Sequence, residues 1–158
     1  LNSMQLEATA HIVADASATF ELIECSQVYQ FSLFLKLTHP ALHAQFPALG
    51  ETRLRQAFIR GLAPSPSRLQ KDVSAALVQC GWTHEFEFVT KEGLSLDLAQ
   101  PSSRHAIEVD GPSHYLRDIE TGGLVENGAT LLKSRLLAGL GWTVVHIPYD
   151  EWDKVEQS

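Results

Sequence analysis

The chain has 158 residues, 44% of them hydrophobic and 20% charged, and its formal net charge at pH 7 is −7. This length is enough for one domain, or for one compact domain and part of a neighbour. The hydrophobic fraction excludes a disordered chain, and the negative net charge excludes a protein whose whole surface binds nucleic acid. No apolar stretch is long enough to span a bilayer, so we expect no membrane partner, and the two distant cysteines exclude a disulfide scaffold.

The N-terminal third of the sequence predicts helices. Apolar residues in the segment 12–20 recur at steps of three and four, which is the period of a helix. We expect a break around residues 21–26, and a second helix that ends before Pro40, because proline disfavours helical geometry in the residue before it. A third helix is expected at residues 51–61. Residues 1–62 are therefore predicted to form a helical segment, and helix after helix is typical of the end of a helical repeat array.

A stretch rich in proline and serine at residues 62–67 marks the expected boundary, since prolines end regular structure. From residue 66 to residue 155 the apolar pattern changes. The elements expected there are a helix at 67–80, strands at 82–89, 94–99 and 105–111, a helix at 130–139, a strand at 142–149 and a short helix at 150–155. Residues 118–127 are expected to form a loop, and the last strand is expected to be buried on both sides. The order α-β-β-β-α-β predicts an α/β domain with a small mixed sheet, preceded by the all-α segment.

Positive charge is concentrated in one short stretch. Residues 51–71 carry five basic side chains and one acidic, whereas residues 72–158 carry six basic and fourteen acidic side chains. An arginine suits phosphate because its planar fork of N–H groups matches the phosphate oxygens. The stretch is therefore either a patch that contacts phosphates or the solvated face of a helix and linker.

Three acidic residues are expected to meet on the sheet. In residues 94–98 the leucines share one face and Asp97 points to the other, and in residues 105–110 both Glu108 and Asp110 lie opposite the apolar side chains. If the two strands are neighbours, the three carboxylates converge and repel one another unless a cation compensates. Such oxygens suit Mg²⁺ or Mn²⁺, which would activate water for phosphodiester cleavage. The alternative is that each acid caps a turn or pairs with an arginine.

The spacing of these acids resembles the PD-(D/E)xK nuclease core, in which an acid on one strand and an acid-x-lysine on the next hold the metal. Asp110 stands where that lysine is expected, and Lys133 in the following helix is a second source of a lysine at the site. His114, four residues beyond Asp110, is similar to the histidine of the very-short-patch-repair endonucleases. This resemblance implies Asp97, Glu108 and Asp110 as metal ligands and His114 as a general acid or base.

A closer resemblance covers residues 66–154, a little over half of the chain. Six segments carry it in this order: SRLQKDV at 67–73, LSLD at 94–97, AIEVDGPSHY at 106–115, GATLLKSRLL at 128–137, GW at 141–142 and IPYDEW at 147–152. Together these segments resemble a RAP domain. Asp150 departs from the pattern, because an aromatic residue is common at its position in the family.

The RAP resemblance implies a restriction-endonuclease-like fold at the C-terminus of an organellar protein, often behind helical repeats. It also implies a role in RNA processing, stability or translation in the mitochondrion or the plastid. The implied partners are organellar mRNA or rRNA and, in addition, ribonucleoprotein or ribosomal proteins. Residues 1–4 contain no targeting signal, and we expect the sequence to begin inside a longer protein.

Three functional hypotheses follow. In the leading one the chain binds RNA, and Tyr115, beside an exposed turn, stacks on a base. The cations expected to contact phosphates are Arg68, Lys71, Lys133 and Arg135. In the second the chain is a metal-dependent endoribonuclease that uses the three acids and His114. In the third a degenerate nuclease fold serves ribonucleoprotein assembly, which the negative net charge favours over RNA binding.

The remaining aromatic residues and histidines of the second part are interpreted as structural. Trp82, Trp142, Phe86 and Phe88 lie on expected strands and are assigned to the core rather than to platforms for base stacking. His146, in the last strand, is interpreted as an interior histidine whose ring is hydrogen-bonded.

Overall fold

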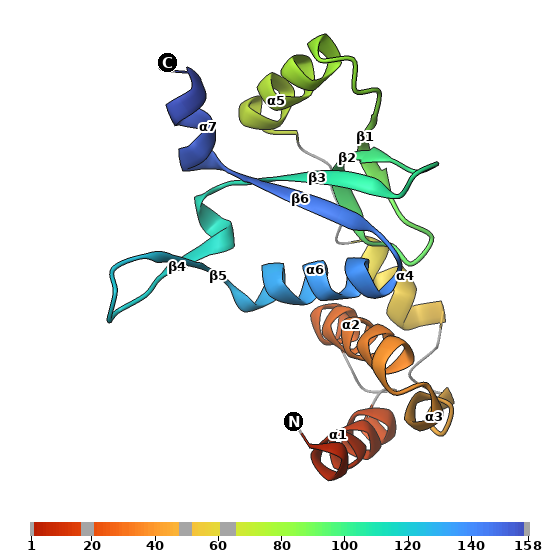
Figure 1. Ribbon diagram of the computed structural model, residues 1–158. Helices are drawn as coiled ribbons and strands as arrows, with labels where there is room; N and C mark the ends of the chain where they lie inside the picture. The colour runs from red at the N-terminus through yellow and green to blue at the C-terminus, as the bar shows by residue number, and fades with distance from the viewer. Residues whose placement is uncertain (1, 17–20, 48–51, 61–65, 157–158) are drawn as a thin grey trace. The chain divides into compact units, whose positions relative to one another are not determined.

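The computed structural model describes residues 2–16, 21–47, 52–60 and 66–156 (Figure 1). The chain divides into two compact units, Leu1–Ala63 and Pro64–Ser158. Within the described ranges, no helix combines the length and the apolar character that crossing a membrane requires. Of the boundary predicted at residues 62–67, residues 62–65 lie outside the described part of the chain.

The first unit is helical. Its elements are α1 (Ser3–Ala16), α2 (Leu22–Thr38), α3 (Pro40–His43) and α4 (Thr52–Arg60). The break predicted at residues 21–26 is wrong for residues 22–26, because Glu21 and Glu24 form a capping box that starts α2 at Leu22. Pro40 ends α2 as expected and is the first residue of α3. Buried residues from several helices, among them Leu6, Cys25, Leu35 and Leu54, form the core of this unit.

The second unit is a mixed α/β sheet with helices on both faces, as predicted (Figure 1). Helix α5 (Arg68–Gln79) precedes β1 (Glu85–Val89), β2 (Ser95–Gln100) and β3 (His105–Asp110), which pair antiparallel in that order. Helix α6 (Gly128–Gly139) then crosses over to β6 (Thr143–Pro148), which pairs parallel to β3 and leads into α7 (Tyr149–Glu156). Helix α5 covers one face of this sheet and α6 the other.

The prediction that the last strand is buried on both sides is wrong. The strand order is β1-β2-β3-β6, so β6 is an edge strand of the described sheet, and Val145 is 56% exposed. Its neighbour Ile147 packs instead against the core formed by Val73 of α5, Leu98 of β2 and Val109 of β3. The apolar residues of β6 therefore belong to a partly exposed edge strand and not to a strand in the middle of a sheet.

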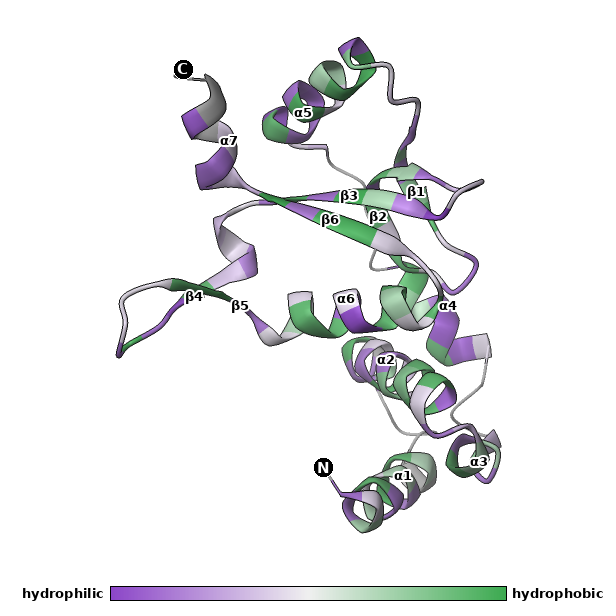
Figure 2. Ribbon diagram, in the orientation of Figure 1, coloured by the Kyte–Doolittle hydropathy of each residue, from purple (hydrophilic) through white to green (hydrophobic). Residues whose placement is uncertain are grey.

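The segment predicted as a loop at residues 118–127 is partly a β-hairpin. A short 3₁₀ helix, η3 (Pro112–His114), leads into β4 (Tyr115–Arg117), which pairs antiparallel with β5 (Leu124–Glu126). The turn between them is held by the Asp118 carboxylate, which accepts hydrogen bonds from the backbone N–H groups of Glu120 and Thr121. The hairpin projects from the unit and carries exposed apolar side chains (Figure 2).

Candidate functional site

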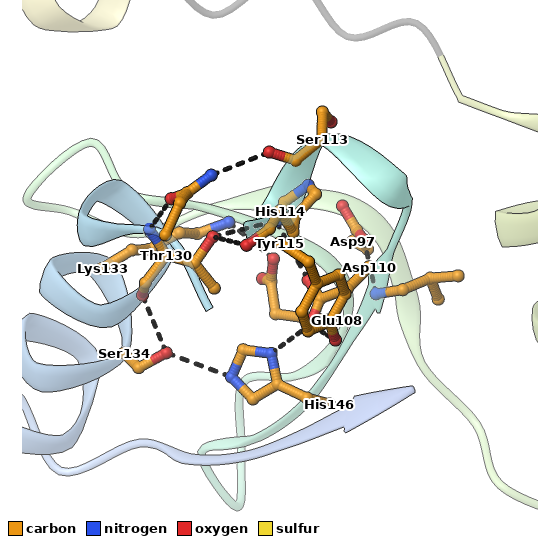
Figure 3. A network of polar contacts seen from close by, with 12 residues as sticks. Asp97, Glu108, Asp110, Ser113, His114, Tyr115, Thr130, Lys133, Ser134 and His146 are labelled. Carbon is orange, nitrogen blue, oxygen red and sulfur yellow. Dashed lines mark hydrogen bonds and ion pairs between the residues drawn. The ribbon is translucent and has the colours of Figure 1, made fainter. Parts of the chain in front are cut away.

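A polar network occupies the face of the sheet that α6 covers (Figure 3). The residues of the polar network are Asp97, Glu108, Asp110, His114, Tyr115, Thr130, Lys133, Ser134 and His146. Strand pairing explains its position. The register Leu98–Ile107 between β2 and β3 puts Asp97 opposite Glu108 one step further on, and Glu108 is the parallel partner of His146 on β6. Helix α6 adds Thr130, Lys133 and Ser134 at helical spacing.

The side chain of Asp97, on β2, accepts a hydrogen bond from the backbone of β3 where the backbone pairing of the two strands ends. The paired register of β2 and β3 ends at Leu98 and Ile107, and the carboxylate Oδ2 of Asp97 accepts the N–H of Val109 at 2.8 Å. A buried backbone N–H without an acceptor is costly, so this contact stabilises the point where the strands stop pairing. Asp97 therefore has a structural task in addition to any chemical one.

Glu108 is the least well compensated charge of the network. It is 2% exposed, its Oε2 lies 2.6 Å from Nζ of Lys133, and its Oε1 is buried without a hydrogen-bond partner among the described residues. Burial raises the pKa of Glu108 to about 7, although Lys133 opposes the rise, and the negative charges of Asp97 and Asp110 add to it. Lys133 thus reaches the site from α6, which compensates for the absence of a lysine at position 110.

Asp110 has the opposite environment, although it lies only two residues further along β3. It is 1% exposed, and its carboxylate contacts Nδ1 of His146 at 2.6 Å, Nδ1 of His114 at 3.1 Å and the hydroxyl of Tyr115 at 3.3 Å. Burial alone would raise the pKa of Asp110, but the hydrogen bond and charge of His146 and the charge of His114 outweigh it, so the pKa is lowered. Asp110 is therefore held as a carboxylate.

Both ring nitrogens of His146 have hydrogen-bond partners. Nε2 of His146 lies 3.1 Å from Oγ of Ser134, whose hydroxyl is also 3.0 Å from the carbonyl oxygen of Thr130. The other ring nitrogen, Nδ1, faces the Asp110 carboxylate. The hydrogen bond to Asp110 raises the pKa of His146 against the effect of burial. The Asp110 carboxylate therefore favours the protonated form of His146.

A metal ion would meet competition from a proton at this end of the network. Among the described residues, ligand atoms of Asp110, Glu126 and His146 lie within 4.8 Å of one another. Only Asp110 belongs to the set predicted from the sequence. A histidine must be neutral to ligate a metal, so the raised pKa of His146 makes a proton a competitor for any metal at these three residues.

The cations predicted to contact phosphates do not form one surface. Arg68 and Lys71 are exposed on α5, whereas Lys133 and Arg135 belong to α6 on the opposite face of the sheet. Lys133 is occupied by Glu108, and Arg68, whose side chain is 95% exposed, lies 3.6 Å from Asp72. The four cations thus lie on two helices that cover opposite faces of the sheet, which the sequence pattern did not show.

Tyr115 is also more constrained than the stacking hypothesis requires. Its ring is half-buried and its hydroxyl donates to Asp110. Burial and the negative charge of Asp110 raise the pKa of Tyr115 to about 12. The phenol is therefore a neutral donor that helps to hold the Asp110 carboxylate.

Sequence reasoning missed several members of this site. Thr130 and Ser134 were not singled out, although their spacing with Lys133 puts all three on one helical face, which was the available signal. His146 was correctly interpreted as hydrogen-bonded, but its partner Asp110 was not identified. Glu87 on β1 was missed as well, and its pKa is raised by burial and by the charge of Asp97.

Comparison with known proteins identifies the family. Residues 107–158, which include Glu108, Asp110 and His146, match the model of the RAP domain. Over 143 residues the chain is 30% identical to "RAP domain-containing protein, chloroplastic" from Oryza sativa subsp. japonica, a match that covers 86% of this chain and 21% of the relative. The chain thus spans about a fifth of the length of this relative. With the matched segment forming β3, α6, β6 and the polar network between them, the chain belongs to the RAP-domain proteins.

Proposed function

We propose that this chain is the RNA-binding part of an organellar RNA-metabolism protein that acts in RNA processing, stability or translation. The observation that carries the proposal is the match of residues 107–158 to the RAP domain. The relative from rice is named chloroplastic, which supports a plastid over a mitochondrion as the compartment. Organellar mRNA or rRNA is the proposed partner.

Charge restricts how RNA binds. Residues 64–158 carry fourteen acidic and eight basic side chains, so an extended duplex would meet net repulsion along most of the surface. We infer a short contact with an unpaired RNA end or loop near η3, where Pro112 and Ser113 are exposed. Asn127 holds this turn through its side-chain donation to the Ser113 carbonyl at 2.7 Å. Exposed Arg135 on α6 is the proposed phosphate contact on the same side of the sheet.

The test is fluorescence anisotropy of the whole chain with a labelled single-stranded RNA. If two phosphates are contacted, Kd should rise about sevenfold between about 50 and about 200 mM salt. Arg135→Gln should weaken binding, whereas Arg68→Gln, on the opposite face, serves as the matched control. The absence of binding, or binding that salt and both substitutions leave unchanged, would refute the proposal.

A metal-dependent endoribonuclease is the second candidate, and one observation favours it. The Oε1 atom of Glu108 is buried without a hydrogen-bond partner among the described residues, as expected for an oxygen that ligates a cation. Asp97 and Glu108 would hold Mg²⁺ or Mn²⁺, which supplies an activated water for phosphodiester cleavage. Lys133 would offset the charge that develops on the phosphate, and His114 would act as general acid or base.

End-labelled RNA incubated with the chain in Mg²⁺, Mn²⁺ or EDTA tests this second candidate. Cleavage should occur only with metal and should be lost in Glu108→Gln, but not in Glu85→Gln, which alters an exposed acid on β1. Cleavage in EDTA or equal cleavage by both variants would contradict it. A chain that neither binds nor cuts RNA would favour a third role, in ribonucleoprotein assembly.

A further inference from the structure

A second concave feature lies in the second unit, outside the polar network. It is a cavity of about 300 Å³ where three connections meet: the end of β1 and its turn, the turn between β2 and β3, and the junction of α6 with β6. The cavity is lined by Phe88, Thr90, Lys91, Glu92, Pro101, Arg104, Leu140 and Trp142. Its lining shares no residue with the polar network, so the role proposed for that network leaves the cavity unexplained.

Two aromatic rings border the cavity. The ring centroids of Phe88 and Trp142 are 5.6 Å apart and their planes are inclined at 47°. Both side chains are only partly buried. The two rings thus pack against each other and also line a space that a ligand can enter. Aromatic faces of this kind stack on nucleobases with little dependence on base identity.

Arg104 supplies a positioned guanidinium at the same cavity. Its Nη1 donates to the carbonyl of Leu140 at 3.2 Å, which leaves further N–H groups of the five for a ligand. The backbone is held as well, since the Arg104 carbonyl accepts the N–H of Thr143 at 2.9 Å and the residue keeps a left-handed φ of 54°. Gly141 makes room for it, because a Cβ there would lie 3.0 Å from Nη1.

The remaining polar groups complete the chemistry of the cavity. Lys91 and Glu92 lie on the turn after β1, with Nζ and Oε1 3.7 Å apart. The cavity thus offers aromatic rings for a base, two cations for a phosphate and a carboxylate that can accept from a base N–H. Its volume is at the small end of ligand pockets, which suits one nucleotide and excludes a folded segment.

We propose that this cavity binds one unpaired nucleotide of a single-stranded RNA, with the base on the Phe88–Trp142 pair and the phosphate at Arg104. The proposal rests on the RNA-binding function proposed above and adds a second contact point to it. An unpaired nucleotide is required because the bases of a duplex already stack on one another. In an otherwise acidic unit, cations beside aromatic rings favour a nucleotide over an acidic peptide, because the peptide's carboxylates would use the cations but not the aromatic rings.

The experiment uses the whole chain, with AMP and a labelled single-stranded oligoadenylate RNA as probes. NMR should show that AMP shifts the indole N–H resonance of Trp142 more than that of Trp82, which lies outside the cavity lining. Phe88→Leu and Arg104→Gln should each weaken RNA binding by about fivefold or more. Phe86→Leu, on the same strand but outside the lining, is the matched control and should change the affinity by less than about twofold.

The possible results distinguish failure of the cavity proposal from failure of the RNA-binding function. A dispersed NMR spectrum and an unchanged thermal transition for each variant establish that the variants fold, and Arg104→Lys adds a variant that keeps the charge without the fork. If RNA still binds but Phe88→Leu and Arg104→Gln leave its affinity unchanged, the cavity proposal is overturned and the RNA-binding function survives. If neither RNA nor AMP binds, both fail. Shifts caused by an acidic peptide but not by AMP would assign the cavity to a protein and overturn the proposal.

Discussion

The pKa of Glu108 predicts how the stability of the second unit depends on pH. The pKa of this side chain is raised from 4.5 to about 7, so the native state holds the proton more tightly than the unfolded state does. The associated stabilisation is complete below pH 4.5 and is lost as the pH rises through 7. Each tenfold difference in proton affinity between the two states is worth about 1.4 kcal/mol, so the loss amounts to about 3 kcal/mol.

Glu108→Gln removes this titration and keeps the shape of the side chain. Between pH 5 and pH 8 the free energy of unfolding of the variant, relative to the original chain, should increase by about 2.5 kcal/mol, because a neutral amide avoids the buried charge. Urea unfolding followed by tryptophan fluorescence reports on the correct unit, since Trp82, Trp142 and Trp152 all lie in it. Glu85→Gln, at an exposed position of β1, is the control and should change by less than about 0.5 kcal/mol.

The reasoning is refuted if the difference between Glu108→Gln and the original chain is the same at both pH values. It is equally refuted if the variant loses relative stability as the pH rises. Either result would mean that Lys133, and not burial, controls the charge of Glu108. Titrating groups far from Glu108 are present in both proteins and cancel in the difference, whereas Asp110 and His146 are coupled to its charge and contribute to the difference.

Three further predictions concern the same face of the sheet. Lys133→Met should destabilise the unit by about 3 kcal/mol at pH 8, because it leaves the buried Glu108 carboxylate unpaired. At pH 5, where Glu108 is protonated, the loss should be much smaller. Equal losses of unfolding free energy at both pH values, measured by urea unfolding, would contradict this prediction. His146→Gln should reduce the stability most at low pH, because the raised pKa of His146 stabilises the fold below the ordinary value of 6.5 and this effect is lost as the pH rises. NMR titration of the His146 ring should show that its pKa is no longer raised in Asp110→Asn. An unaltered pKa in that variant would contradict the pairing of His146 with Asp110. Asn127→Ala should cost at least about 1 kcal/mol, because it removes both the α6 N-cap and the donation to the Ser113 carbonyl, whereas Asn127→Asp keeps the cap and should cost less. Thermal unfolding that ranks the two variants equally would show that the cap does not contribute.

Local patterning carried most of the information about the sheet. Alternation along two strands was sufficient to direct Asp97, Glu108 and Asp110 away from the apolar core, because a pleated strand admits no other arrangement. Helix ends were similarly accessible where proline determined them, as at Pro40. The capping box that begins α2 at Leu22 escaped notice because glutamate is not a preferred capping residue.

Long-range pairing was not accessible in the same way. His146 meets Asp110 because β6 returns parallel to β3, and the alternation within each strand does not give the register between the two strands. The separation of Arg68 from Arg135 has the same origin, since the side of the sheet on which each helix packs depends on the crossover. The nuclease-like details of the fold stay a prediction from the resemblance, whereas the mixed α/β sheet is established.

Glu108 and Asp110 point to different tasks, although both are buried carboxylates on one strand face. Asp110 faces two imidazoles and a phenol, which lower its pKa, whereas Glu108 has a single cation and an oxygen without a partner among the described residues, and its pKa rises to about 7. Neighbouring acids whose environments drive their pKa values apart divide the roles of fixed charge and exchangeable proton. Glu108 is then the group of this pair that changes its charge near neutral pH, and cation binding or proton transfer at the site depends on it. The contact of Asp110 with His146 favours the charged form of each group and connects β3 to β6, and His146 in turn contacts Ser134 of α6. If the chain cleaves RNA, the pH dependence of the rate should therefore follow the ionisation of Glu108; a rate that follows His146 instead would reverse this assignment.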